Sequence, residues 1–250
     1  MVAEKTNGLV LGASGGLAQA VIARLLADTA IETVFAVSSK PLPDCLQDEQ
    51  SLVWIQTDYQ EPSMVRVVEQ LQPFAGTFSR VCICHGLLHT ESLWPEKRLE
   101  DINAEALHDI FQSNAVVPAL WLKLLHKVLK GRQPTVVAIF SARVGSIGDN
   151  RLGGWYAYRS SKAALNMLLQ NMAIEYARRV KNVKLIAFHP GTTDTALSKP
   201  FQATVPEGKL FTPAFVAERL AGIMDNAAAD PDMMDGQLSY LDWDNKRIPW

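Results

Sequence analysis

Two residues of this 250-residue chain, Tyr158 and Lys162, have types and a spacing that indicate acid–base chemistry. They lie four positions apart, and at about 100° per residue such positions differ by only about 40° around a helix, so the side chains share one face. Tyr156 lies six positions before Lys162 and does not share it. Because a cation beside a phenol favours the phenolate, we expect the pKa of Tyr158 to fall from about 10 by roughly 1–3 units, which suits a general acid or base. Such a pair on its own is most often two surface neighbours.

A glycine-rich turn follows the first apolar run of the chain. Residues 9–18 read LVLGASGGLA and pass from a predicted strand into a predicted helix. Small residues permit a tight turn there, and they let backbone N–H groups at the helix N-terminus approach a pyrophosphate. Many strand-to-helix turns use glycine, but this one follows the first strand of a predicted βαβ unit, which favours dinucleotide binding.

The end of the second apolar run bears on which dinucleotide is bound. Residues 36–40 read AVSSK, where NAD-binding chains usually keep an acidic residue for the ribose hydroxyls. Ser38 and Lys40 suit a 2′-phosphate, so the sequence favours NADP, with NAD as the alternative. A solvated surface lysine is the simpler explanation of Lys40.

Short, β-branched apolar runs alternate with segments of helical spacing along the whole chain. This order predicts βαβ crossovers and an α/β fold: a single doubly wound parallel sheet (a Rossmann fold) with helices on both faces, formed by one domain over residues 1–250. The irregular stretch 192–211 is expected to be a substrate lid. The predicted strands are residues 9–11, 33–37, 52–55, 80–84, 135–140, 183–188 and 237–241, and the predicted helices are residues 17–28, 62–71, 104–129, 157–179 and 213–225.

Composition narrows the classes of function. The chain is 48% hydrophobic and 20% charged with a net charge of −2, which is typical of a globular protein and offers no broad positive field for nucleic acid. The first hydrophobic stretch is too short to span a membrane, and no apolar signal region precedes it, so we expect a cytoplasmic protein. Three cysteines, at positions 45, 82 and 84, are too few and too badly spaced for a disulfide framework or a metal site.

Four motifs occur in a fixed order: the glycine turn, Asn114 in a long predicted helix, the Tyr158–Lys162 pair, and HPGTTDT at residues 189–195. This set resembles the short-chain dehydrogenase/reductase family, and the resemblance covers nearly the whole chain. Within the family, GSIGDN at 145–150 and GGWYAYRSSK at 153–162 look like the branch of C-factor-like proteins and related carbonyl reductases.

The resemblance implies a set of cofactor-binding residues. Ser38 and Lys40 would lie at the 2′ position, Asp58 and the backbone of Tyr59 would meet the adenine, and Gly86 matches the last residue of the family's Asn-Asn-Ala-Gly turn. Ile83, Cys84 and His85 replace the first three residues of that turn. The phosphates and ribose would contact Gly12, Ser14, Gly15, Gly16 and Leu17, and the nicotinamide end would contact Tyr158, Lys162, Pro190, Gly191, Thr193 and Thr195.

The resemblance also implies the catalytic roles. Tyr158 would exchange the proton, Lys162 would hold the nicotinamide ribose, and Asn114 would hold a water that links Lys162 to solvent. The family places a carbonyl-polarising serine where this chain has Ala142, counted back from Gly145. Either Ser141 or Ser146 could take that role, and Ser141 is slightly favoured because it lies at the strand end.

These observations predict an NADP-preferring reductase or dehydrogenase that acts on a small carbonyl or alcohol substrate and forms a homodimer or homotetramer. Trp155 and Phe201 either line its substrate pocket or belong to the core. The alternative function is that of a dinucleotide-binding regulatory or signalling protein with vestigial catalysis. No nucleic acid, membrane or metal partner is expected.

Overall fold

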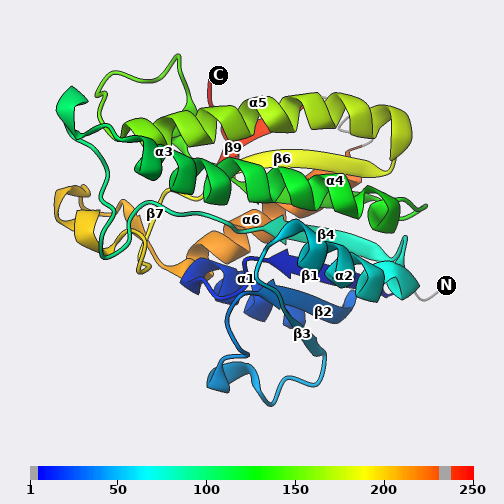
Figure 1. Ribbon diagram of the computed structural model, residues 1–250. Helices are drawn as coiled ribbons and strands as arrows, with labels where there is room; N and C mark the ends of the chain where they lie inside the picture. Colours follow the sequence, from blue (N-terminus) through cyan, green and yellow to red (C-terminus); the bar gives the residue numbers. More distant parts are fainter. Residues whose placement is uncertain (1–4, 231–237) are drawn as a thin grey trace.

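A seven-stranded parallel sheet forms the centre of the protein (Figure 1). The computed structural model describes residues 5–230 and 238–250. The strand order is β3-β2-β1-β4-β5-β6-β9, and the direction of winding reverses between β1 and β4, so the predicted doubly wound sheet is confirmed. The strands are β1 (Thr6–Leu11), β2 (Ile31–Ser38), β3 (Leu52–Gln56), β4 (Phe78–Ile83), β5 (Thr135–Phe140), β6 (Val183–His189) and β9 (Ser239–Asp242).

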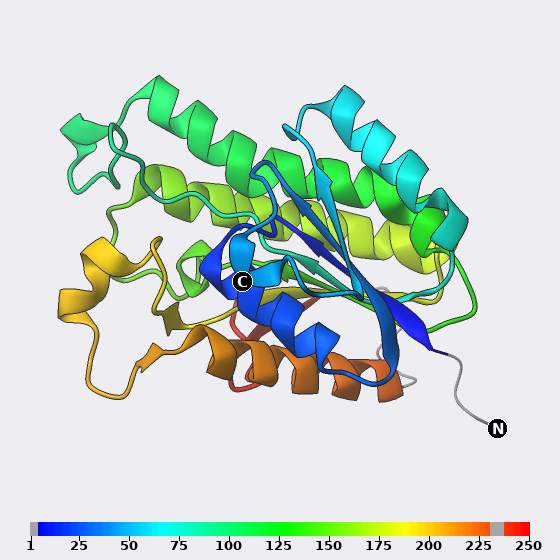
Figure 2. The same ribbon diagram turned by 90° about the horizontal axis from the view of Figure 1, so that it is seen from below.

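Helices cover both faces of the sheet. Figure 2 shows α1 (Gly16–Leu26) and α6 (Pro213–Ala229) side by side on one face. The other face carries α2 (Glu61–Leu71), α3 (Ala104–Phe111), α4 (Val117–Leu129) and α5 (Tyr156–Arg179). No helix in the described part of the chain is long and apolar enough to cross a membrane. Short 3-10 turns are η1 (Asp44–Leu46), η2 (Gln72–Phe74), η3 (Leu99–Asp101) and η5 (Arg143–Gly145).

Each face of the sheet buries its own apolar cluster. On the face of α4 and α5, the fully buried Trp121 packs with side chains of β1, β4 and β5. On the face of α1 and α6, residues such as Ile22 and Leu220 pack against the opposite sides of the same strands. Strands buried on both faces explain why the apolar runs are continuous rather than alternating.

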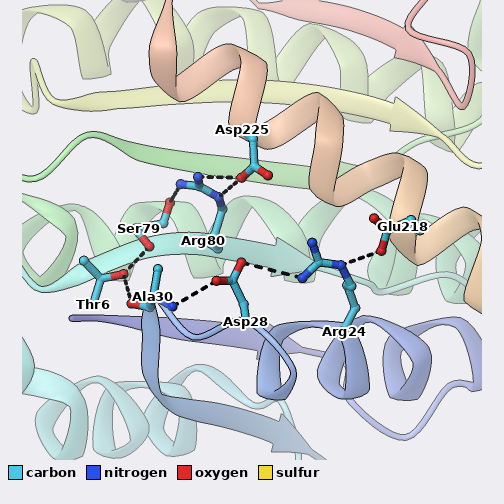
Figure 3. A network of polar contacts seen from close by, with 8 residues as sticks. All are labelled: Thr6, Arg24, Asp28, Ala30, Ser79, Arg80, Glu218 and Asp225. Carbon is cyan, nitrogen blue, oxygen red and sulfur yellow. Dashed lines mark hydrogen bonds and ion pairs between the residues drawn. The ribbon is translucent and has the colours of Figure 1, made fainter. Parts of the chain in front are cut away.

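A polar network ties α1 and α6 to the amino-terminal edge of the sheet (Figure 3). Arg24 of α1 bonds Glu218 of α6 at 2.5 Å and also approaches Asp28 at 3.6 Å. Arg80 of β4 reaches Asp225 of α6 at 2.7 Å. Exposed ion pairs each contribute about 0–1 kcal/mol, so this network fixes the pairing of the two helices more than it stabilises the fold.

The predicted helix 104–129 is confirmed in its bounds, but it is not a regular α-helix throughout. A π-helical turn, η4 (Gln112–Val116), separates α3 from α4, and Val117 N donates to Gln112 O five residues back. Pro118 has no N–H to give to the carbonyl of Asn114, four residues earlier, so the α-helical pattern cannot run through this point.

The stretch 192–211 is more regular than expected. β7 (Thr192–Thr193) pairs in parallel with β8 (Leu210–Phe211), and the 3-10 helix η6 (Lys199–Thr204) lies between them. The segment projects from the carboxyl edge of the sheet beside residues 87–103 (Figure 1). The last predicted strand is β9, two residues later than expected at its start, and position 237 lies outside the described residues.

Gly76 and Gly131, which precede β4 and β5, are in close contact, and this contact predicts an effect on stability. A Cβ on Gly131 would stand 2.6 Å from the Gly76 Cα, whereas a Cβ on Gly222 in α6 meets nothing within 4 Å. We expect Gly131→Ala to lower the free energy of unfolding by about 1–3 kcal/mol through overpacking, and Gly222→Ala to raise it by about 0.5–1 kcal/mol. Urea unfolding of both variants measures the two changes, and equal effects of the same sign would contradict the packing argument.

Candidate active site

A cavity of about 840 Å³ opens at the carboxyl edge of the sheet. It lies where the winding reverses between β1 and β4, which is the usual position of a ligand crevice in doubly wound sheets. Its walls come from the glycine turn, from the segments that follow β4, β5 and β6, and from the start of α5. Of the predicted site residues, eleven line it: Gly15, Gly16, Leu17, Gly86, Ser141, Tyr158, Lys162, Pro190, Gly191, Thr193 and Thr195.

The structure brings Tyr158 and Lys162 together on the buried face of α5. Lys162 is 2% exposed, and its Nζ donates a 2.7 Å hydrogen bond to the carbonyl of Phe140 at the end of β5. The same Nζ lies 5.9 Å from the centre of the Tyr158 ring. Burial lowers the pKa of Lys162 to about 7, because an ammonium loses its hydration inside the protein.

The expected fall in the pKa of Tyr158 is not found. Burial raises its pKa to about 12, with a further contribution from Tyr240. The expectation was wrong because it counted the attraction of a cation and left out the loss of hydration, which penalises the phenolate. The lowered pKa of Lys162 also leaves only part of its population charged at neutral pH.

Asn114 lies in the π-helical turn and is fully buried. Its side chain accepts a hydrogen bond from Leu87 N at 2.7 Å and donates to Leu87 O at 2.9 Å. It also donates to Ser161 Oγ at 3.1 Å, and Ser161 in turn donates to the carbonyl of Tyr158. Asn114 therefore joins the segment after β4 to the helix that carries Tyr158, while its own backbone carbonyl has no α-helical N–H partner at Pro118.

The glycine turn has the geometry of a phosphate cradle. Gly12 has φ +80°, and the N–H groups of Gly12 and Ala13 both reach the carbonyl of Val37. Gly15 is the N-cap of α1, with no capping side chain, and a Cβ there would meet only the Gly12 carbonyl at 4.0 Å. A helix N-terminus with free N–H groups and open space in front of it fits a pyrophosphate. Ser14 lies on the same turn but does not line the cavity.

The predicted adenine-side residues gather near the ends of β2 and β3, away from the cavity wall. Ser38 is fully buried, and its Oγ accepts a hydrogen bond from Lys40 N at 3.0 Å. Asp58 accepts hydrogen bonds from Gln60 N and from a serine at the start of α2. Tyr59 has φ +61°, and its hydroxyl donates to Val37 O at 3.4 Å. Their contacts with a cofactor stay predictions.

His85, beside the glycine turn, is a neutral imidazole in a single tautomer. Trp121 Nε1, which can only donate, gives a 3.1 Å hydrogen bond to His85 Nε2. Burial lowers the pKa of His85 to about 3, so the neutral ring carries its proton on Nδ1. That nitrogen lies 3.4 Å from where a Cβ of Gly12 would stand, so a hydrogen-bond donor faces the first glycine of the turn.

The segment after β6 is held close to the glycine turn. Gly191 has φ +73°, and a Cβ there would stand 2.6 Å from the Phe211 ring, so only glycine fits. Thr193 Oγ1 donates to Gly191 O at 3.3 Å, and Thr195 Oγ1 donates to Thr193 O at 3.4 Å. A Cβ on Gly16 would contact the Thr195 methyl group at 3.7 Å, so the two segments face each other across the cavity.

The two candidate serines differ in their surroundings. Ser141 lines the cavity, and its Oγ donates to Asn166 Oδ1 at 2.7 Å. Ser146 does not line the cavity, and its Oγ accepts a hydrogen bond from Asp149 N at 3.1 Å. Ala142 lines the cavity and offers no hydroxyl. The polarising role of Ser141 stays a prediction.

The buried carboxylate of Glu96 was not predicted from the sequence. Glu96 is 4% exposed and comes from the segment between β4 and α3. Both its carboxylate oxygens accept from Ala157 N at 3.3 Å, and its carbonyl accepts from Trp155 N at 2.6 Å. Glu96 therefore caps α5, the helix that bears Tyr158, although Glu96 and Ala157 are 61 positions apart in the sequence. A local sequence pattern cannot predict such a contact. No group of three metal-ligating side chains occurs in residues 5–230 and 238–250.

Residues 7–206 match the family model described as short chain dehydrogenase, so the chain belongs to the short-chain dehydrogenase family and is an oxidoreductase. The 1-hydroxy-2-glutathionyl-2-methyl-3-butene dehydrogenase of Rhodococcus sp. (strain AD45) is 27% identical over 238 residues, which cover 94% of this chain and 98% of that protein. The C-signal of Myxococcus xanthus is 36% identical over 111 residues, or 43% of this chain and 63% of that protein.

Solved structures share the fold. Carbonyl reductase Sniffer of D. melanogaster superposes with a TM-score of 0.82 at 19% identity, covering 99% of this chain and 100% of that one. The NADPH-bound carbonyl reductase from chicken fatty liver gives 0.80 at 20% identity, with the same coverage. At such identities the likeness establishes the architecture and leaves the substrate open.

The burial of Lys162 predicts a pH dependence of stability. Its pKa is about 7 in the folded chain against an ordinary 10.5, so between these values the unfolded chain binds more protons and stability rises with pH. Lys162→Met removes this term. We therefore expect the free energy of unfolding of the wild type, minus that of Lys162→Met, to increase from pH 7 to pH 9.5. Urea unfolding at both pH values measures the difference, and a pH-independent value would show that Lys162 is charged in the folded protein.

Proposed function

We propose that the protein is an NADP-preferring carbonyl reductase or alcohol dehydrogenase. The observation that carries this proposal is the position of the half-buried Tyr158 beside the buried Lys162, in the cavity that the uncapped α1 N-terminus also faces. A phenol and an ammonium next to a phosphate cradle suit a reaction that moves one proton while a nicotinamide supplies or accepts the hydride.

The binding roles follow the glycine turn, the ends of β2 and β3, and the cavity wall after β6. The turn with Gly12, Ser14, Gly15, Gly16 and Leu17 holds the diphosphate, Asp58 and Tyr59 meet the adenine, and Gly86 lies by the nicotinamide ribose. The carboxamide of the nicotinamide is held by Pro190, Gly191, Thr193 and Thr195, all of which line the cavity opposite the glycine turn. His85 adds a donor at Nδ1 near that turn.

In the proposed reaction, Tyr158 gives its proton to the developing alkoxide of the substrate. Lys162 lies beneath the tyrosine ring, binds the nicotinamide ribose and offers positive charge to the phenolate that remains. Asn114 holds a water through its backbone carbonyl, and this water connects Lys162 to solvent. The carbonyl can accept it because Pro118 supplies no N–H.

We assign the polarisation of the substrate carbonyl to Ser141. In the observed orientation of Asn166, its Oδ1 takes the serine proton, while its buried Nδ2 has no partner among the described residues. The oxygen and nitrogen of the Asn166 amide exchange places when the amide is turned over, and the side chain fills the same space in both orientations. Turning the amide lets Nδ2 donate to Ser141 Oγ and leaves the serine proton free for the substrate oxygen.

The preference for NADP rests on the chain around Ser38 and Lys40. No carboxylate follows β2, Ser39 and Lys40 are exposed there, and Ser38 holds the turn through Lys40 N. The NADPH-bound carbonyl reductase of similar fold is consistent with this preference. NAD is the alternative cofactor, and comparing the affinities of NADPH and NADH distinguishes them.

The similarity to C-signal favours a second candidate, a dinucleotide-binding regulatory or signalling protein. It covers less than half of this chain, so the C-factor-like branch is a proposal too. A regulatory protein has no need of a half-buried phenol beside a buried lysine and a buried asparagine, which favours the enzyme. We further propose a cytoplasmic homodimer or homotetramer that associates through α4 and α5, where Met167 and Ile174 are 64% and 42% exposed.

Tyr158→Phe tests the proton transfer. We expect the reduction of carbonyl substrates by NADPH to slow by about 10²–10⁴-fold, the usual contribution of a general acid, while the Kd for NADPH, followed by its fluorescence, changes little. Tyr156→Phe is the matched control and should retain the wild-type rate. Survival of activity within about threefold in Tyr158→Phe would reject the assignment and direct attention to Tyr156.

The two serines are separated by their alanine variants. Ser141→Ala should slow the reduction by about 10²–10³-fold, the usual cost of losing one such donor, whereas Ser146→Ala should change it little. Adding Ala142→Ser to Ser141→Ala places a hydroxyl at the family's position and should restore part of the rate. The reverse pattern would move the role to Ser146. Indifference to both alanine variants would mean that Tyr158 alone holds the carbonyl.

A further inference from the structure

Four rings from three separate segments form a continuous cluster beside the cavity. This aromatic cluster consists of His89, Trp94, Trp155 and Phe201. Trp155 and Phe201 lie 5.1 Å apart between ring centres, and Phe201 approaches His89 at 5.7 Å and Trp94 at 6.1 Å. His89 stacks on Trp94 at 5.3 Å with an interplanar angle of 19°. Such edge and stacked contacts are the preferred geometries of aromatic groups.

The aromatic cluster adjoins the proposed proton donor. The Trp155 ring lies 6.2 Å from the Tyr158 ring, nearly edge-on at 75°. Trp155 and Phe201 both line the cavity, and the neighbouring wall is apolar, with Leu88, Leu197 and Pro200. The cavity wall also includes Lys97 and Arg143, but the part of it next to Trp155 offers rings and aliphatic side chains to a substituent of a carbonyl held at the Tyr158 hydroxyl.

The position of Trp155 is fixed by an unusual backbone. Trp155 has φ +51° and ψ +45°, in the left-handed region that a bulky residue rarely adopts. Its N–H is bound by the Glu96 carbonyl at 2.6 Å, and the Glu96 carboxylate caps the next turn at Ala157 N. Backbone strain of this kind persists where the surroundings over-determine it, and it clusters at functional sites.

We propose that the substrates are aryl carbonyl compounds whose aromatic ring packs on Trp155 and Phe201. This inference rests on the proposed carbonyl reduction and names the substrate class of the same site. Glu96 holds the backbone of Trp155, and Phe201 is supplied by η6, so the segment 192–211 contributes directly to specificity. A saturated ring of the same size fills the same volume but loses the quadrupolar part of the contact.

Two aldehydes of matched shape test the substrate class: benzaldehyde and cyclohexanecarbaldehyde, each reduced with NADPH. The measured quantity is the ratio of kcat/KM for the aryl aldehyde to kcat/KM for the saturated one. Comparing this ratio between variants cancels the different intrinsic reactivities of the two compounds. Phe201→Leu and Trp155→Leu keep an apolar side chain and remove the ring, and Phe74→Leu, on the remote 3-10 turn η2, is the matched control.

We expect Phe201→Leu and Trp155→Leu each to lower the ratio by about 3- to 10-fold, the range that ring–ring contacts contribute, mainly through KM for benzaldehyde. Phe74→Leu should leave the ratio unchanged, and all variants should bind NADPH as the wild type does. An unchanged ratio in both cavity variants, with both aldehydes reduced, would overturn the aryl preference while the proposed reduction stands. Failure of the wild type to reduce either aldehyde, despite NADPH binding, would overturn both.

Discussion

The rest of the site depends on the buried hydrogen bond between Lys162 Nζ and the carbonyl of Phe140. A lysine that is 2% exposed has almost no hydration, and an unpaired ammonium in such a place costs several kcal/mol. The free carbonyl at the end of a parallel strand supplies the partner. This requirement fixes α5 against the end of β5, and Tyr158, one turn earlier, is thereby brought over the carboxyl edge of the sheet where the chain winding reverses.

Irregular backbone places the other functional groups around this helix. Pro118 interrupts the α-helical pattern, and the resulting π-helical turn buries Asn114 against Leu87 and Ser161. At the start of α5, Trp155 takes a left-handed conformation that Glu96 holds. Both departures from regular helix cost stability locally. The first holds Asn114 behind the segment after β4, and the second brings the Trp155 ring to the cavity wall.

The sequence predicted the parts that local spacing determines. Continuous apolar runs located all seven strands of the main sheet, and i, i+4 spacing placed Tyr158 and Lys162 on one face, because periodicity reflects burial directly. The π-helical turn was not predicted, because the apolar pattern of residues 104–129 continues through it. Pro118 was the one local signal of an irregularity there. Glu96 and the partners of Ser141 could not be predicted, because those contacts join residues 25 to 61 positions apart and carry no periodic pattern.

The pKa values of the pair bear on the protonation state in which the proposed reaction begins. Burial raises the pKa of Tyr158 to about 12 and lowers that of Lys162 to about 7, so at neutral pH the phenol keeps its proton. A protonated phenol suits the proposed donation of a proton to the developing alkoxide of a carbonyl substrate. Protonation of Lys162 gives it a positive charge, and this charge stabilises the Tyr158 phenolate that is left after the proton is donated. In the proposed reaction the lysine therefore acts most strongly after the proton has moved, and a water at Asn114 would supply the replacement proton.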